Sequence, residues 1–396
     1  MTSSGIIGLV KNRTVFAVSA VELLRVMGRS GTWIFIPIYL ILKRDVPFID
    51  IGFLFLVSSI TSIPVSLFGG NLVDRIGRRK IAIALPPFIS LIFLLMFLDI
   101  YYNLPLIIMY LSFISLFPLG GLQEVTDNVM ITDTTIESER IDAFSIVRIS
   151  ANIGFSIGPA LSGIALSYNF AILPLIPLIG EIIGFFLYFR IIRETKPISH
   201  NENRLISFPH KDRRFLIIAI VLALSWFSIG PWGYILSQFL SAVDKLSYSL
   251  IGIIFAVNGI AVISLQLPVN RALYKIDDMT RVSLGLIVYS ATFFIFSLTR
   301  DVTLLIINVV ALTIGENIIS PASSSVIGKI APEDKRGQYY GGFSLINNLI
   351  GPFSPLLYEF LLSLFFRGPV ILWGIISSIC ISLAFIIIFL RFWKRV

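Results

Sequence analysis

Between two long apolar runs the chain reads Gly70-Asn71-Leu72-Val73-Asp74-Arg75-Ile76-Gly77-Arg78-Arg79-Lys80. This segment holds four basic residues and one acid, and it is too short to form a domain of its own. In membrane proteins, basic residues that flank apolar segments stay on the cytoplasmic side of the bilayer. We therefore expect a short cytoplasmic loop, turned at its glycines, between two membrane-spanning helices.

The composition of the whole chain agrees with a membrane protein. Of its 396 residues, 56% are hydrophobic and 14% are charged, whereas about 25% of residues are charged in soluble domains. At ~20 residues per bilayer crossing, twelve crossings take roughly 240 residues. The net charge of +8 does not indicate nucleic-acid binding, because lysine and arginine occur in short clusters between apolar blocks. We expect an all-α, multi-pass protein in the lipid bilayer, with no nucleic-acid partner.

Apolar runs bounded by charge, proline or asparagine predict twelve transmembrane helices. Their ranges are 14–42, 50–72, 81–100, 105–128, 143–167, 171–190, 214–240, 249–270, 281–299, 302–325, 338–364 and 368–390. With both termini in the cytoplasm, 23 of the 31 basic residues fall on cytoplasmic segments, five on external segments and three within helices. The distribution of basic residues thus predicts cytoplasmic termini and an even number of spans.

One polar, basic linker, residues 191–213, divides these helices six and six. We expect an N-terminal bundle over residues 1–190 and a C-terminal bundle over residues 214–396. A shift of 200 residues places the segment from Ile51 over the segment from Ile251, with several identities, and a basic loop follows both. Two parallel six-helix repeats are one architecture of secondary transporters.

The segment from Gly70 to Lys80 follows the pattern G-x-L-x-D-R-x-G-R-R/K. It resembles the cytoplasmic signature loop of the major facilitator superfamily (MFS) at every defining position. The resemblance implies alternating access, with Asp74 capping the helix that starts near Arg336. It also implies that Arg78 pairs with a carboxylate at the cytoplasmic end of the fourth helix, either Asp127 or Glu124. The gating residues implied are Gly70, Asp74, Arg75, Gly77, Arg78, Arg79 and Asp127.

The fifth predicted helix contains small residues at close-packing spacing around Gly154, Gly158 and Pro159. The run resembles the G-x-x-x-G-P-x-x-G-G pattern of drug-efflux proton antiporters in the superfamily, with Ser162 in place of one glycine. The fourth helix departs from that branch, because Leu116, Phe117 and Pro118 stand where many of these antiporters carry an arginine. The loop that corresponds to the signature in the second half, Tyr274 to Asp278, has lost the pattern. We therefore expect the gating contacts of the signature loop in the first half alone.

Ionisable residues within the bilayer are costly, and they usually face a cavity or a partner. Glu22, Arg25 and Arg29 lie on one face of the first helix, because their spacings are three and four residues. One interpretation is an ion-pair network with Glu124 and Asp127; the other is a binding site for an anionic group or a titrating carboxylate. The candidate substrate or proton residues are Glu22, Arg25, Arg29, Arg148, Asn258 and Glu316, of which Glu316 is the expected proton carrier.

Two transport functions follow from these residues, and they remain open at this stage. The first is proton-coupled efflux of small amphipathic compounds; the second is proton-coupled import of a sugar or organic anion. No nucleophile motif, nucleotide-binding loop or cluster of metal ligands in the sequence indicates an enzyme, a cofactor or a metal site. We expect a monomer in the cell membrane that uses a gradient, with protons and a small molecule as its ligands.

Overall fold

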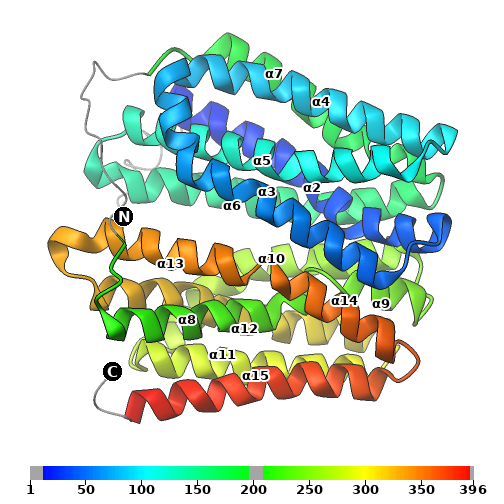
Figure 1. Ribbon diagram of the computed structural model, residues 1–396, viewed down its shortest axis with the longest axis vertical. Helices are drawn as coiled ribbons and strands as arrows, with labels where there is room; N and C mark the ends of the chain where they lie inside the picture. The colour runs from blue at the N-terminus through cyan, green and yellow to red at the C-terminus, as the bar shows by residue number, and fades with distance from the viewer. Residues whose placement is uncertain (1–11, 196–207, 393–396) are drawn as a thin grey trace. The chain divides into compact units, whose positions relative to one another are not determined.

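The computed structural model describes residues 12–195 and 208–392, and all regular structure in these ranges is helical (Figure 1). Most of the predicted linker, residues 196–207, lies outside them. The first half contains α2 (Arg13–Arg44), α3 (Phe48–Ile76), α4 (Arg78–Tyr102), α5 (Leu106–Thr134), α6 (Glu137–Leu166), η1 (Phe170–Ile172) and α7 (Leu175–Ile191). The second half contains α8 (Arg213–Ile229), η2 (Gly230–Trp232), α9 (Leu236–Ala242), α10 (Tyr248–Ala272), α11 (Asp278–Phe296), α12 (Val302–Ile330), η3 (Glu333–Lys335), α13 (Arg336–Ile350), α14 (Phe353–Phe365) and α15 (Pro369–Phe392).

Eleven helical segments within residues 12–195 and 208–392 are long and apolar enough to cross a membrane. The 32-residue helix α2 is not among them, and it carries Glu22, Arg25 and Arg29. Each of the twelve predicted ranges nevertheless falls on a helix or on a pair of helices in one span. The prediction of a multi-pass helical protein is therefore confirmed.

The charged segment from Gly70 to Lys80 is not a loop along its whole length. Helix α3 continues to Ile76 and α4 begins at Arg78, so Gly77 is the one residue between them. Gly77 has φ 106°, a backbone conformation open to glycine and strained for other residues. The predicted loop was too long, because a single glycine reverses the chain.

The described residues fall into two compact units. Unit 1 comprises the described parts of Met1–Asp45, Leu54–His200 and Leu246–Gly259, and unit 2 those of Val46–Phe53, Asn201–Lys245 and Ile260–Val396. Each unit takes in a short segment from the other half of the sequence. The division at residues 190 and 214 into two six-helix bundles, and the cytoplasmic termini, therefore stay predictions.

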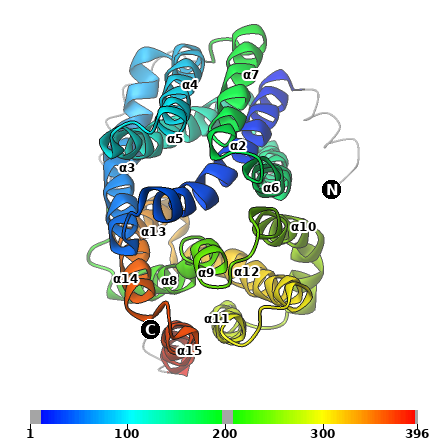
Figure 2. The ribbon, with the colours of Figure 1, turned by 90° about the vertical axis from the view of Figure 1, so that its right-hand side faces the viewer.

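Unit 1 is built around α2, which packs against α6 and α7 (Figure 2). The contact with α6 is close because glycines of α6 face the backbone of α2. A Cβ atom at Gly154 would lie 2.5 Å from the carbonyl oxygen of Leu23, and one at Gly158 would lie still closer to the carbonyl oxygen of Met27. These contacts hold the charged face of α2 at a fixed position beside α6.

We expect Gly158→Ala to destabilise the protein by about 1–3 kcal/mol, because the added methyl group would overlap the Met27 backbone and force α2 away from α6. Thermal unfolding of the purified protein measures this loss. Gly70→Ala is the matched control, since a Cβ atom at Gly70 meets nothing within 4 Å in α3. Equal unfolding temperatures for the two variants would contradict the close packing.

Unit 2 has an aromatic centre around Trp373 of α15. The ring of this buried tryptophan lies 5.2 Å from Phe239, 5.8 Å from Phe293 and 5.4 Å from Phe296, between ring centroids. Helix α11 packs against α12 and α15 (Figure 2). Two spans of unit 2 are broken, one between α8 and α9 and the other between α13 and α14, at Gly351 and Pro352.

Candidate functional site

Unit 1 contains a cavity of about 570 Å³ at the charged face of α2. Helices α2, α5 and α6 supply its lining, which combines both charges with apolar and aromatic side chains. The charged residues in the lining are Glu22, Arg25, Arg29, Glu124, Asp127 and Arg148. The larger apolar residues are Val26, Trp33, Phe144, Val147 and Phe155. Such a lining suits a ligand that has an apolar body and a charged group.

Arg25 lines this cavity, and its charge is neutralised by Asp127 and Glu22. Its Nη1 atom lies 2.7 Å from Oδ2 of Asp127, and the hydroxyl of Tyr188 donates to the other oxygen of Asp127 at 2.7 Å. The side chains of Arg25 and Asp127 are only 4% and 7% exposed. A buried pair of this kind holds three helices together, because Arg25 comes from α2, Asp127 from α5 and Tyr188 from α7.

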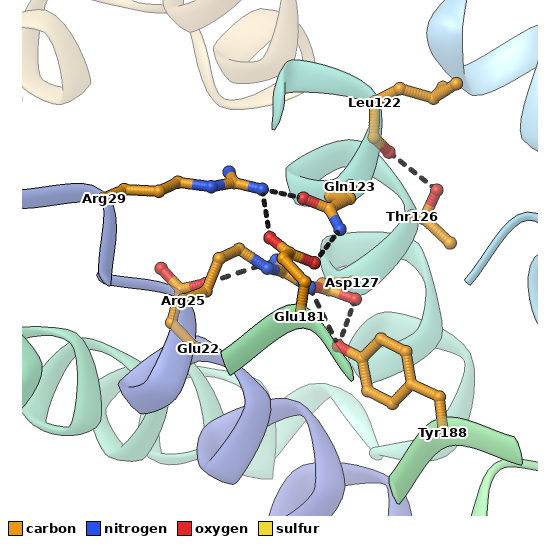
Figure 3. Close-up of polar contacts among 9 residues, drawn as sticks. All are labelled: Glu22, Arg25, Arg29, Leu122, Gln123, Thr126, Asp127, Glu181 and Tyr188. Atoms are coloured by element: carbon orange, nitrogen blue, oxygen red, sulfur yellow. Dashed lines mark hydrogen bonds and ion pairs between the residues drawn. The ribbon is translucent and has the colours of Figure 1, made fainter. Parts of the chain in front are cut away.

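Arg29 is neutralised in the same way by Glu181 of α7 (Figure 3). Its Nη2 atom lies 2.7 Å from Oε1 of Glu181 and also donates to Gln123. Gln123 in turn donates to Oε2 of Glu181 at 3.0 Å. Arg29 was expected either to bind an anionic group or to hold a carboxylate, and in this triangle its charge is paired with the buried carboxylate of Glu181.

Glu22 differs from the other acids of this network. Its carboxylate lies 3.4 Å from Nη1 of Arg25, a longer contact than the 2.7 Å from Arg25 to Asp127. The side chain of Glu22 is 26% exposed, and it lines the cavity. Glu22 is therefore the acid of the ion-pair network that a proton or a ligand reaches most easily.

Two further charged residues of the lining, Glu124 and Arg148, are exposed at the cavity. The sequence is compatible with two interpretations of these charges, an ion-pair network and a binding site. Arg25 and Arg29 form ion pairs with Asp127 and Glu181, whereas Glu22, Glu124 and Arg148 line the cavity, whose role as a binding site stays a prediction.

The signature residues of unit 1 form a separate cluster at the ends of α3, α4 and α5. Arg78 lies 2.6 Å from Asp74 and 3.1 Å from Asp133, and its backbone N–H donates to Glu194 at 3.0 Å. Arg78 does pair with a carboxylate near the end of α5, but that carboxylate is Asp133, so both named candidates, Asp127 and Glu124, were wrong. Asp127 lies six residues before Asp133 in α5, about 9 Å deeper, where it binds Arg25.

The other predicted gating residues surround this cluster. Arg79 donates to the carbonyl oxygens of Ile192 and Phe189, whereas Arg75 is exposed and Gly70 lies within α3. Glu194 is a residue that sequence reasoning missed. It fills the space beside Gly77, where a Cβ atom would lie 2.8 Å from its Oε2 atom.

Unit 2 carries a charge pair at the equivalent place, with the signs reversed. Arg78 starts α4 and Asp278, 200 residues later, starts α11. Arg78 binds Asp133 one residue before the end of α5, and Asp278 binds Lys329, at 2.5 Å, one residue before the end of α12. The second half has lost the signature, but it retains an ion pair between the corresponding helix ends.

The two remaining predicted ligand residues lie elsewhere. Glu316 is half-buried on α12 in unit 2 and Asn258 is buried on α10 in unit 1, and neither lines the cavity of unit 1. Gly154, Gly158 and Pro159 are buried in α6, as expected of packing residues. The role of Glu316 as a proton carrier stays a prediction.

Sequence reasoning missed Gln123 and Tyr188 as members of the charge network. Gln123 precedes Asp127 by four residues, and Tyr188 follows Glu181 by seven, so each polar pair lies on one helix face. These spacings indicate polar stripes on the two helices that carry them, α5 and α7. They do not show which helix the stripes face, and that requires the fold.

Asp244, in the connection after α9, is a titratable group outside the spanning segments. Burial raises the pKa of its carboxyl to about 6, although Arg300 at 3.2 Å opposes the shift. An unfolded aspartate has a pKa of about 3.9, so the folded protein holds this proton more tightly. The stabilisation is therefore present below about pH 4 and is lost as the pH rises through about 6.

We expect this group to make the protein more stable at acidic than at neutral pH, by about 3 kcal/mol. Unfolding temperatures measured across this range would show the dependence, and Asp244→Asn should remove it. Asp45→Asn is the control, because Asp45 is exposed in another connection. An unaltered pH profile in Asp244→Asn would contradict this assignment.

Two similar proteins are named as transporters. The chain is 23% identical over 330 residues to an uncharacterised MFS-type transporter, YttB, of Bacillus subtilis (strain 168), covering 80% of each chain. It is 24% identical over 341 residues to a Na(+), Li(+), K(+)/H(+) antiporter of Planococcus maritimus, covering 76% of this chain and 80% of the relative.

Solved transporter structures share the fold. The crystal structure of a mutant of the nucleoside transporter NupG superposes with a TM-score of 0.79 at 12% identity, covering 95% of this chain and 99% of the other. A POT family transporter in complex with 5-aminolevulinic acid superposes with a TM-score of 0.77 at 15% identity, covering 95% and 96%. The sequence profile of the Major Facilitator Superfamily matches residues 18–299 and 215–395. The chain belongs to this superfamily of membrane transporters.

Proposed function

We propose that the protein is a proton-coupled antiporter that exports small amphipathic compounds carrying a positive charge. The observation that carries this proposal is the position of Glu22. Its carboxylate lines the cavity of unit 1, and its contact with Arg25 is the longer of the two that this arginine makes with acids there. A carboxylate in this position can bind either a proton or a cationic group, and competition between the two provides coupling.

The rest of the lining supports an amphipathic cation. Glu124 adds a second exposed acid, and Trp33 and Phe155 add aromatic surface, which attracts cations as well as apolar rings. The relative from Planococcus maritimus is named as an antiporter that exchanges cations for protons. The resemblance of the Gly154 to Gly163 run to drug-efflux antiporters points in the same direction.

Import of an organic anion has less support. It was suggested by Arg25, Arg29 and Arg148 as partners of an anionic group. Two of these arginines lie 2.7 Å from buried carboxylates, so their charge is already compensated. An anion that approached them would have to displace Asp127 or Glu181.

We also propose a monomer in the cell membrane with both termini in the cytoplasm. The excess of basic residues on the segments assigned to the cytoplasm supports this orientation. Cysteine labelling from one side of the membrane, at residues introduced in the two termini, tests it. Labelling of either terminus from outside intact cells would contradict the proposed orientation.

The transport proposal is tested in proteoliposomes with an acidic lumen that contains a pH-sensitive dye. Apolar cations such as tetraphenylphosphonium, then sodium and potassium, sugars and organic anions are added in turn outside. Alkalinisation of the lumen on adding an apolar cation is the expected result, since protons leave as the cation enters. Acidification with a sugar or an anion would establish symport, and no response to any compound would contradict proton coupling.

A further inference from the structure

Unit 2 contains a buried acid that the proposed cation site does not use. Glu359 of α14 has no exposed surface, and neither has Gln238 of α9, which donates a hydrogen bond to Oε1 of Glu359. Both residues lie on the second segments of broken spans, since α9 follows the break after α8 and α14 follows the break after α13. Broken helices are the places where transporters of several folds bind coupling ions.

The hydrogen bonds of this pair lack one proton. The amide nitrogen of Gln238 donates to the carbonyl oxygen of Tyr234 at 3.0 Å as well as to Glu359, so both of its hydrogens are used. Two buried acceptors are left without a donor among the described residues, Oε2 of Glu359 and Oε1 of Gln238. A proton on Oε2 would turn this acceptor into a donor, and the unsatisfied amide oxygen belongs to the residue that already binds Glu359.

Positive charges do not approach Glu359 from the described elements around it. The charged residues of α8 are Arg213 and Arg214. They lie at the start of the helix, whereas Ser228 lies at its end, and η2 has no charged residue. Two titratable groups of α14 and α15, Tyr358 and Cys380, both donate to the carbonyl oxygen of Ser228.

The neighbouring residues of α3 and α15 add no ion pair to Glu359 in the described parts of the chain. Near the start of α3, Gly52 faces the Cβ atom of Glu359, and Asp50 is exposed. On α15, Arg391 binds Asp277. An ionised Glu359 would therefore be a buried charge without a cation, which is the costliest form of a carboxylate in a protein interior.

We infer that Glu359 is a proton-binding site, whose proton joins α9 to α14 through a two-bond carboxyl–amide pair with Gln238. One hydrogen bond runs from the amide nitrogen to Oε1, and the other from the protonated Oε2 to the amide oxygen. Loss of the proton leaves two facing acceptors and a buried negative charge. The pair then breaks, so the second segments of the two broken spans separate or admit water.

Infrared spectroscopy of the purified full-length protein tests the proton directly. At about pH 8, where an ordinary glutamate with a pKa of about 4.3 is ionised, wild-type protein should show a carboxylic-acid C=O band that is lost in Glu359→Gln. This variant places an amide where the carboxyl group stood, and the amide can form the same two hydrogen bonds with Gln238 without a titrating group. Glu333→Gln is the control, because Glu333 is 93% exposed, and this variant should keep the band.

Hydrogen–deuterium exchange tests the connection between the two segments. Exchange in residues 236–242 should rise in wild-type protein when the pH is taken high enough to remove the band, and it should stay low in Glu359→Gln. A spectrum without an acid band assignable to Glu359 would overturn the proton site and indicate an ionised carboxylate with trapped water. Exchange that follows pH equally in both proteins would overturn the role in joining α9 to α14. Neither measurement needs a transported substrate, so failure here is independent of the antiport proposal.

Discussion

Arg25→Met is expected to destabilise the protein by about 3–5 kcal/mol, the cost of leaving a buried carboxylate without its partner. Arg25 lies 2.7 Å from Asp127, and both side chains are almost fully buried. Methionine keeps much of the length of the side chain while removing its charge and its donors. Asp127 would then retain the hydrogen bond from Tyr188, which cannot compensate for the missing cation. Thermal unfolding in detergent and the yield of folded protein both measure the effect.

Two further variants distinguish the stability contribution of the Arg25–Asp127 ion pair from that of any other change in α2. Arg13→Met changes an exposed arginine at the start of the same helix, and it should leave the unfolding temperature close to that of wild type. The double variant Arg25→Met/Asp127→Asn removes both charges and keeps an acceptor for Tyr188. It should recover most of the lost stability, because the penalty comes from the unpaired charge. A double variant as unstable as Arg25→Met would contradict this interpretation.

The helices could be predicted from the sequence because each apolar run that crosses a bilayer must satisfy its backbone hydrogen bonds within itself. The ion-pair partners of the charged residues could not be predicted in this way. The network of unit 1 joins residues up to 163 positions apart, as between Arg25 and Tyr188, and such pairings depend on how α2, α5 and α7 are rotated about their axes. Spacing places Glu22, Arg25 and Arg29 on one face of α2, but it does not show which helix that face meets.

Two predictions from the sequence, the loop after Gly70 and the partner of Arg78, were wrong for the same reason. In both cases a helix ends at a different residue than expected. The segment after Gly70 contains glycine and charge, which suggests a loop, yet α3 continues to Ile76 because Gly77 alone provides the turn. Helix α5 likewise extends beyond the predicted end at residue 128, to Thr134. Asp133 therefore lies at the helix end, where Arg78 binds it, and Asp127 is left for Arg25.

Glu22→Gln should abolish coupling between proton and substrate movement. Glutamine has the shape of the glutamate and can accept a hydrogen bond from Arg25, but it neither titrates nor carries a charge at neutral pH. We expect substrate-driven proton flux to fall by roughly 100-fold, the scale on which removal of a positioned proton-transfer group acts. The dye assay in proteoliposomes measures this flux. Stability should change little, because Asp127 remains as the close partner of Arg25.

Glu124→Gln distinguishes proton coupling at Glu22 from a general loss of negative charge in the cavity. Glu124 lines the same cavity from α5 and is exposed there. If Glu22 alone carries the proton, Glu124→Gln should weaken the apparent affinity for an apolar cation while the number of protons exchanged per cation stays unchanged. In Glu22→Gln, by contrast, any cation movement that remains should no longer depend on the pH gradient. Proton exchange preserved in Glu22→Gln and lost in Glu316→Gln would move the coupling site to α12 and return the function of Glu22 to the structural network around Arg25.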